Sequence, residues 1–417
     1  MRQQTRSGRT ILGNLVSDVM IANAPPAYAR TMASVTPRKL WLAAPGDCVV
    51  VLAPCSPVFR DYVARINGVA PEKYDLVQPD RLFLGHALDL VKERGAVGRV
   101  AARPVLLPFV LDRYVTEFAA SADMRIEGYQ SPPGPETIAA VRVINTKSGF
   151  REIAAGLGLP VAPGGNAATT EELADRLQEF LSSRPAAIVK MNRSSNGFAT
   201  TVVRADHPEP VAAQVAGIAG QHGESSTGWV YEELLDFTAV PSLELTVSEH
   251  GPDLFSTCDQ RTTNNAWTGM TAPAAQGSID RTYPAALAIG RWLHDRGYRG
   301  VFDLDCCLLD RGYVVTEANV RRTGGTYLEE LARTLRPGED RVHWVADARL
   351  GAQSLTFEEA AGALERAGLA DPQASVRVVL TVDTVELDGK WRYLIVGADA
   401  DRVCAAEEEV SAILELK

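Results

Sequence analysis

The densest group of side chains that could carry out chemistry lies where two apolar-rich segments flank a turn at residues 310–312. An Asp-Arg-Gly turn between two such segments predicts a β-hairpin. If those three residues are the loop, Leu309 faces Tyr313. Counting four residues away from the loop along each strand then places Asp305 opposite Glu317. Like charges in directly opposite positions destabilise a sheet, and a hard cation would turn that repulsion into ligation.

The same register adds an amide and a third carboxylate to that face, because side chains two residues apart lie on one side of a strand. Asp303 then faces Asn319. Carboxylate and amide oxygens suit Mg²⁺, which usually takes one or two carboxylates together with substrate phosphates. The sequence therefore predicts Asp305, Glu317 and Asn319 as magnesium ligands. The alternative is a solvated polar face on an edge hairpin.

The composition limits the kind of protein that holds this hairpin. The chain has 417 residues with 46% hydrophobic and 23% charged side chains, which is typical of a soluble globular protein of two or three domains. The net charge of −10 argues against a nucleic-acid coat, and no apolar stretch is long enough to cross a membrane. The six scattered cysteines lack a CxxC spacing and the N-terminus lacks a signal-peptide core, so we expect a cytoplasmic protein with reduced thiols.

The pattern of apolar residues predicts an α/β protein in three parts. They are an N-terminal α/β domain over residues 1–140, a second domain over 141–336 and a C-terminal subdomain over 337–417, with a linker at 122–138. The predicted helices are 145–161, 169–181, 283–297, 357–366 and 400–414. The predicted strands are 47–55, 102–111, 185–191, 198–204, 228–236 and 240–251, with hairpins at 300–319 and 376–396.

Two lysines in the second part are placed where anions bind. Lys147 lies near the start of a predicted helix, where the dipole and free N–H groups favour negative charge. Lys190 ends a predicted strand and precedes the polar loop 192–197, and a small polar loop can bend close to phosphates and donate backbone N–H groups. For either lysine alone a solvated surface role is the more common one. Their order and spacing relative to the hairpin favour phosphate binding.

The spacing Asp305-x11-Glu317-x-Asn319 resembles the metal-binding hairpin of ATP-grasp enzymes, such as D-alanine–D-alanine ligase and biotin carboxylase. The resemblance implies an α+β ATP-grasp fold in which these three residues hold Mg²⁺ under the ATP phosphates. D-alanine ligases have an arginine two residues before the aspartate, where this sequence has Asp303. A phosphate-facing arginine must then come from elsewhere or be absent.

The resemblance also assigns nucleotide-binding roles. Lys147 and Lys190 resemble the two nucleotide-binding lysines of the family, within a lid subdomain at about 185–245. The loop between the strands of that subdomain would close over ATP with Ser195, Asn196 and Gly197. The remaining implied contacts are Glu232 and Leu235 at the adenine and Glu244 at the ribose hydroxyls. The alternative for Glu232 is an exposed charged turn.

A carboxylate substrate calls for arginine, whose planar fork binds it through two hydrogen bonds. Arg321 follows the hairpin directly and is the best candidate. Arg261 lies in the polar segment 257–270, which we expect to be a loop that covers the site. For any single arginine the alternative is a surface cation.

The run EANVRRTGGT and the three-part layout resemble the pheganomycin-type peptide ligases. That resemblance, and not composition or spacing, implies an amino-acid-like carboxylate donor and a peptide amine acceptor. We also expect a homodimer. Two other classes stay open on the same ATP platform. One is a phosphotransferase that stops after phosphoryl transfer, and the other is a nucleotide-binding protein without ligase activity.

Overall fold

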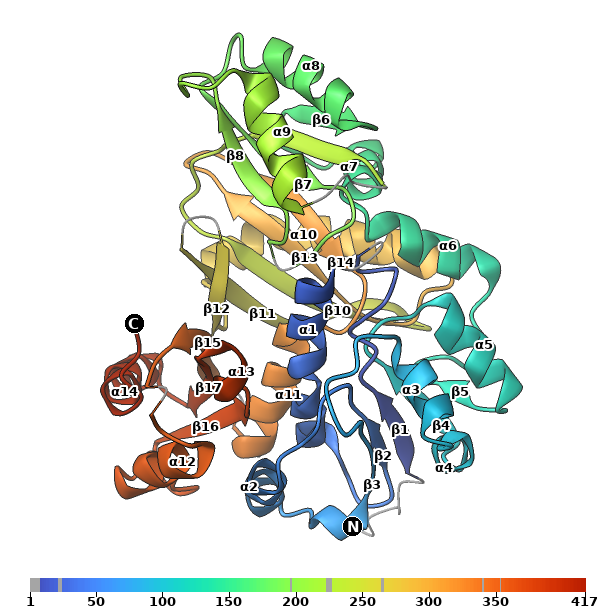
Figure 1. The fold of residues 1–417 in the computed structure, drawn as a ribbon, viewed down its shortest axis with the longest axis vertical. Coiled ribbons are helices and arrows are strands. Elements are labelled where there is room, and N and C mark those ends of the chain that lie inside the picture. Colours follow the sequence, from blue (N-terminus) through green and yellow to red (C-terminus); the bar gives the residue numbers. More distant parts are fainter. Residues whose placement is uncertain are drawn as a thin grey trace.

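The computed structural model describes residues 8–417 except 22–24, 196, 223–226, 264–265, 340 and 353. Within these residues the strands form three sheets, which we call the N-terminal sheet, the lobe sheet and the central sheet. Figure 1 shows the lobe at one end of the molecule, with the N-terminal sheet and the C-terminal helices toward the other end. The protein is therefore α/β, as the sequence predicts.

The N-terminal sheet is parallel, with the order β3-β2-β1-β4-β5. Its middle strands are short apolar runs that are buried on both faces, which is the environment such runs predict. The direction of winding reverses between β1 and β4, which makes a topological switch point at their carboxyl ends. The strands are β1 (Arg9–Leu12), β2 (Cys48–Val50), β3 (Asp75–Val77), β4 (Val105–Pro108) and β5 (Arg125–Ile126). The helices are α1 (Pro26–Ser34), η1 (Thr36–Leu42), α2 (Pro57–Asn67), η2 (Pro71–Lys73), α3 (Ala87–Glu93), α4 (Val97–Ala101) and α5 (Arg113–Ser121).

The lobe sheet is antiparallel, with the order β6-β9-β7-β8, and two helices, α8 and α9, share its apolar core. The helix α8 begins where the predicted helix 169–181 does, because the Thr169 side chain accepts a hydrogen bond from the Glu172 amide and caps it. The strands are β6 (Gly164–Ala167), β7 (Ala186–Met191), β8 (Thr200–Arg204) and β9 (Trp229–Glu233). The helices of this region are α6 (Pro135–Ile144), α7 (Lys147–Gly156), α8 (Thr170–Phe180) and α9 (Val211–His222).

The central sheet has the order β14-β13-β10-β11-β12-β15-β17-β16. Because β12 pairs with β15, the C-terminal segment continues this sheet beyond the predicted boundary near residue 337, which lies between α11 and β15. The strands are β10 (Pro241–Ser248), β11 (Gly251–Thr263), β12 (Ala266–Ala272), β13 (Gly300–Leu308), β14 (Tyr313–Asn319), β15 (His343–Leu350), β16 (Val376–Val382) and β17 (Lys390–Gly397). The helices are α10 (Gln276–Asp295), α11 (Gly324–Leu335), α12 (Phe357–Arg366), α13 (Val385–Asp388) and α14 (Ala400–Ile413).

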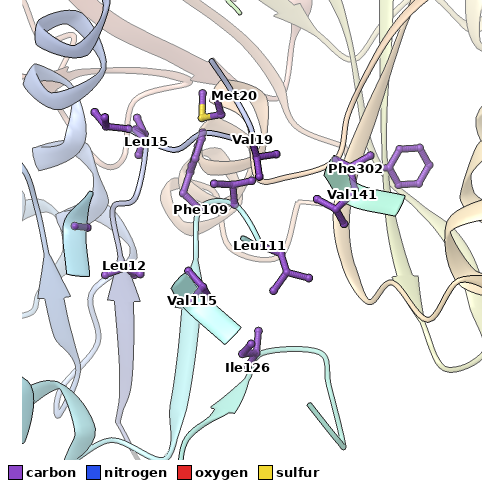
Figure 2. Close-up of a cluster of buried hydrophobic side chains, with 14 of the residues drawn as sticks. Leu12, Leu15, Val19, Met20, Phe109, Leu111, Val115, Ile126, Val141 and Phe302 are labelled. Carbon is purple, nitrogen blue, oxygen red and sulfur yellow. The ribbon is translucent and has the colours of Figure 1, made fainter. Parts of the chain in front are cut away.

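One buried apolar cluster joins the N-terminal sheet to the central sheet. Figure 2 shows part of it, with Leu12 and Phe109 from the N-terminal region and Phe302 from β13. Phe302 and Leu304 point into this core, so the alternate residues Asp303 and Asp305 point to the other face of β13. The core therefore fixes the direction in which the acidic side chains of β13 project.

Three segments differ from the sequence predictions. The predicted linker 122–138 contains the start of α6, whose first residue, Pro135, has the fixed φ that suits this position. The expected loop 257–270 is instead most of the β11–β12 hairpin, because pairing with neighbouring strands outweighs the low strand propensity of its polar residues. The helix predicted from residue 283 begins about two turns earlier, at Gln276.

Two further sequence expectations concern membranes and cysteines. Among the described residues, no helix is long and apolar enough to cross a membrane. All six cysteines lie in the described part of the chain, and none of them is in a disulfide.

An ion pair between Arg261 of β11 and Glu407 of α14 holds the C-terminal helix to the central sheet. Arg261 donates from Nη1 to Glu407 Oε1 at 2.5 Å and from Nη2 to Oε2 at 3.0 Å. Glu407→Gln should lower the free energy of unfolding by about 1 to 3 kcal/mol, because a bidentate, partly buried charged pair is lost. Urea unfolding measures this, with the exposed Glu408→Gln of the same helix as the control. Equal stability of the two variants would contradict the role assigned to the pair.

Candidate active site

The strands β13 and β14, which we call the acidic hairpin, have the pairing that the sequence predicts. Asp305 lies opposite Glu317 and Asp303 lies opposite Asn319. On the other edge of β13, the strand β10 places Glu244 opposite Asp303. Because alternate residues share a face, four acidic side chains and one amide gather on one side of the central sheet.

The loop of the acidic hairpin differs from the prediction, although the final pairing does not. Leu308, and not Leu309, pairs with Tyr313, so residues 309–312 form the loop. A β-bulge at Thr316 then restores the predicted pairing further along the strands. The Thr316 hydroxyl donates to the backbone carbonyl of Asp305 at 3.1 Å, which fixes the bulge beside the acidic group.

Asp303 and Glu244 are buried, Asp305 is half-buried, and these carboxylates carry more negative charge than their surroundings compensate. Burial, and then the nearby Glu244, raises the pKa of Asp303 to about 8. Burial, and then Asp303 and Glu317, raises the pKa of Asp305 well above its ordinary range. Carboxylates that are close together in a site of low dielectric cannot all ionise without a compensating cation. The acidic face is thus suited to binding positive charge.

Glu244 lies at the N-terminus of α11, where a group of hydroxyls binds it. Thr323 caps α11 and donates its hydroxyl to Glu244, and the Thr326 hydroxyl donates to the same carboxylate oxygen at 3.0 Å. A Cβ on Gly325 would lie 3.1 Å from that oxygen, so the glycine allows this close approach. Burial raises the pKa of Glu244 to about 7, although the two threonine hydroxyls act in the opposite direction. The structure thus brings Glu244 to the acidic hairpin, and its predicted ribose contact stays untested.

Lys147 lies between the acidic hairpin and the 192–197 loop. It is the first residue of α7, whose cap is Thr146. Its ammonium donates to the Ser194 carbonyl at 2.8 Å and lies 3.3 Å from Glu317 Oε1. Burial lowers the pKa of Lys147, and the attraction of Glu317 offsets only part of this effect. The structure therefore brings Lys147 to one of the predicted metal ligands.

Lys190 lies in the lobe and pairs with Glu232, one of the residues predicted at the adenine. The Lys190 ammonium donates to Glu232 Oε2 at 2.6 Å, and the Arg151 guanidinium donates to the other carboxylate oxygen. Burial opposes the charge of both partners, but their attraction prevails, so the pKa of Lys190 is raised and that of Glu232 is lowered. Leu235 follows β9 and is half-buried.

The two predicted substrate arginines lie in different surroundings. Arg321 is buried at the end of β14, where its Nη1 donates to Asn145 Oδ1 at 2.8 Å and its Nη2 donates to Asn319 Oδ1. Arg261 is not brought to the acidic hairpin, because its guanidinium is paired with Glu407 of α14. Its neighbour Gln260 points the other way and donates to Asp305 at 2.5 Å.

The 192–197 loop contacts the N-terminal part of the chain. The Ser195 hydroxyl shares a hydrogen bond with the Tyr28 hydroxyl of α1. Gly197 has a φ of +70°, in the left-handed region that glycine adopts without strain. Asn196, the third predicted residue of this loop, lies outside the described residues. The buried Arg193 guanidinium donates to three backbone carbonyls, those of Asp18, Val19 and Arg142.

Sequence reasoning missed four residues that contact the predicted site, namely Tyr28, Asn145, Arg151 and Gln260. Arg151 could have been found, because it lies four residues after Lys147 and therefore on the same face of a helix. The other three gave no sequence signal. Each comes from a separate element that only the folded chain brings to the site.

Among the described residues, no group of three or more His, Cys, Asp or Glu side chains is arranged closely enough to hold a metal ion by itself. The predicted set has two carboxylates and one amide. Mg²⁺ commonly completes its shell with water and substrate phosphates, so such a set does not need a third carboxylate.

Comparison with known proteins agrees with this architecture. Residues 36–124 match the pre-ATP-grasp domain family. No curated protein sequence matches the chain. The matched segment covers most of the N-terminal sheet.

Several solved structures share the fold over almost the whole chain. Biotin carboxylase from Campylobacter jejuni is 12% identical with a TM-score of 0.63, over 98% of this chain and 92% of that one. N5-carboxyaminoimidazole ribonucleotide synthetase from Thermus thermophilus is 16% identical with a TM-score of 0.58, over 97% and 96%. The biotin carboxylase domain of the Hydrogenobacter thermophilus 2-oxoglutarate carboxylase is 11% identical with a TM-score of 0.60, over 98% and 90%. The protein therefore has the ATP-grasp fold that the sequence resemblance implies, and residues 36–124 of its N-terminal part match the pre-ATP-grasp domain.

The buried carboxyl group of Glu244 gives a prediction about pH. A carboxyl group whose pKa is higher in the folded state stabilises the fold at low pH, and this contribution is lost as the pH rises to the folded-state pKa. For Glu244 that window runs from its ordinary value of 4.5 to about 7. Glu244→Gln stays uncharged, so the variant should gain about 3 kcal/mol of stability relative to the wild type across this window. Urea unfolding of both proteins without Mg²⁺ measures the difference, and a difference that does not change with pH would contradict the burial argument.

Proposed function

We propose that this protein is an ATP-dependent carboxylate–amine ligase that forms a peptide bond. The observation that carries the proposal is the contact of Lys147 with both the 192–197 loop and Glu317 of the acidic hairpin. A cation from a helix start, a small polar loop and a buried acidic face meet at one point. Mg²⁺ and a polyphosphate would balance the charges of these three elements.

The nucleotide would lie between the lobe and the central sheet. Lys147 and Lys190 would bind its phosphates, together with Ser195, Asn196 and Gly197 of the loop. Glu232 and Leu235 would lie at the adenine and Glu244 at the ribose, although the contacts of Glu244 with α11 favour a role nearer the acidic hairpin. Similar folds support the choice of nucleotide. The Campylobacter biotin carboxylase was solved with β,γ-ATP, and the Hydrogenobacter domain was solved with MgADP, ADP and bicarbonate.

The residues present fit a magnesium site. Asp305, Glu317 and Asn319 would supply oxygen ligands, and burial, followed by the charges of Asp303 and Glu317, raises the pKa of Asp305. Bound there, Mg²⁺ would neutralise phosphate charge during phosphoryl transfer. The ammonium of Lys147 and the guanidinium of Arg321 already contact Glu317 and Asn319, so they would lie beside the same phosphates.

The proposed chemistry follows from the need of a carboxylate for a leaving group. A carboxylate oxygen attacks the γ-phosphorus of ATP, ADP leaves, and an acyl phosphate forms. The amine of the acceptor then attacks the acyl carbon, and inorganic phosphate leaves as the amide forms and the amine loses a proton. The protein positions both substrates and neutralises charge. Arg321 is the cation placed to hold the carboxylate, whereas Arg261 would first have to leave Glu407.

The choice of a peptide as acceptor rests on the run EANVRRTGGT, which resembles the pheganomycin-type ligases. In this chain the run spans the end of β14, both arginines and the cap of α11. It thus joins two of the three predicted metal ligands, Glu317 and Asn319, to the candidate carboxylate site within ten residues.

Glu317→Gln should lower the rate of ATP turnover by at least about 100-fold, because it removes one of two charged ligands from the proposed metal site. The fold should persist, since the variant relieves repulsion among acidic groups. Circular dichroism checks the fold and ADP release checks turnover. The matched control is Asp310→Asn, an exposed carboxylate in the loop of the same hairpin, which should keep wild-type turnover. Near-normal turnover of Glu317→Gln would remove the metal assignment.

Substrate pairing separates the ligase from its alternatives. ADP and phosphate release should be measured with amino acids alone, with short peptides alone and with both together. Release that requires both, with a new amide product, supports the ligase. A stable phosphorylated product without an amine would establish a phosphotransferase instead, and absence of turnover under every pairing would leave nucleotide binding only.

A further inference from the structure

A second feature of the molecule is a cavity of about 340 Å³ between the N-terminal sheet and the central sheet. On one side it is lined by residues at the carboxyl ends of β4 and β5, such as Pro108 and Ile126. Open α/β sheets bind ligands at the carboxyl ends of their strands. The volume is within the range of small-molecule sites, which begins at about 300 Å³.

The floor of the cavity is continuous with the acidic face. Thr246 of β10 pairs with Val301 of β13, and both line the cavity. Asp303 lies two residues further along β13 than Val301, and Asp305 lies two residues beyond Asp303. These three residues therefore lie on one face of the strand. From Val301 to Asp305 the distance is roughly 13 Å at about 3.3 Å per residue. A ligand in the cavity would therefore lie along the same strand face as Asp303 and Asp305.

The end of the cavity next to the acidic hairpin is cationic. Arg321 and Arg322 both line it. The two hydrogen bonds of Arg321 to Asn145 and Asn319 use two of the five N–H groups of a guanidinium. Arg322 donates to Glu330, but its buried Nε has no hydrogen-bond partner among the described residues. An anionic group of a ligand would satisfy such donors.

The rest of the cavity is mainly apolar and aromatic. Its lining includes Leu107, Phe109, Leu111, Ile126, Tyr129 and Tyr298. The two acidic residues of the lining are less able to attract a cation. Glu127 pairs with Arg9 at 2.9 Å, and Glu249 is exposed to solvent. The chemistry of the lining thus matches an organic acid with an apolar body.

We infer that this cavity binds the carboxylate substrate as a single small acid of amino-acid size, with its apolar body over Thr246 and Val301 and its carboxylate at Arg321. The inference rests on the ligase function proposed above. A peptide acceptor fits less well, because a peptide needs an extended groove, whereas this cavity has a volume of about 340 Å³. The cavity therefore selects the donor by the size of its apolar part.

The test measures binding, so that it does not depend on turnover. Calorimetry is done on protein saturated with a nonhydrolysable ATP analogue and Mg²⁺, with acetate, L-alanine, L-leucine and 3-phenylpropionate as probes. Wild-type affinity should increase from acetate to the larger apolar acids. Thr246→Trp fills the cavity and should weaken binding of the larger acids by at least about tenfold. Thr246→Ser is the matched control and should bind them within about threefold of the wild type.

A second, smaller substitution tests the same cavity floor in case Thr246→Trp does not fold. Val301→Leu adds a single methylene to the same floor and should weaken 3-phenylpropionate more than L-alanine. Unchanged affinity for the ATP analogue shows that each variant is folded with its nucleotide site intact. Binding of no probe, or equal binding by Thr246→Trp and the wild type, would overturn the cavity assignment. Size-dependent binding without ADP release on addition of peptides would leave the cavity assignment in place and reject the ligase.

Discussion

Negative charge buried on one face of the central sheet is the constraint on which the rest of this site depends. Asp303 and Glu244 are buried there, Asp305 and Glu317 are half-buried beside them, and the protein offers these carboxylates few cations. Burial of close carboxylates has a large cost unless protons or bound cations neutralise them. The fold tolerates the cost because Phe302 and Leu304 fix the opposite face of β13 in a large apolar core. Acidic side chains and buried apolar side chains therefore alternate along β13.

The elements around this acidic face each supply a partner from a different part of the chain. The N-terminus of α11 binds Glu244 through two threonine hydroxyls, and β11 supplies the amide of Gln260 to Asp305. The start of α7 supplies Lys147, which reaches Glu317. Such convergence makes the site sensitive to how the N-terminal region, the lobe and the central sheet are positioned. One apolar core extends from the N-terminal sheet to β13 and holds these two parts in position (Figure 2).

Much of the candidate site could be predicted because its residues lie in a single hairpin. The opposition of Asp305 and Glu317 follows from strand geometry, and even a wrong loop length gave the right pair, since a bulge at Thr316 compensated for it. The surroundings of Arg261 could not be predicted from the sequence. Its residue type fits a substrate carboxylate, but the face of β11 on which it lies is set by pairing with β10 and β12, and that face meets Glu407 of α14.

The sequence by itself determined the α/β class, the acidic hairpin and the order of the two lysines, because strand alternation and helix capping are local properties. Only the tertiary structure decided that Glu244 joins Asp303, that Tyr28 contacts Ser195, and that a cavity lies between the two sheets. These features depend on contacts between residues far apart in the chain. Such contacts are fixed by the packing of whole layers against each other, and no short segment encodes them.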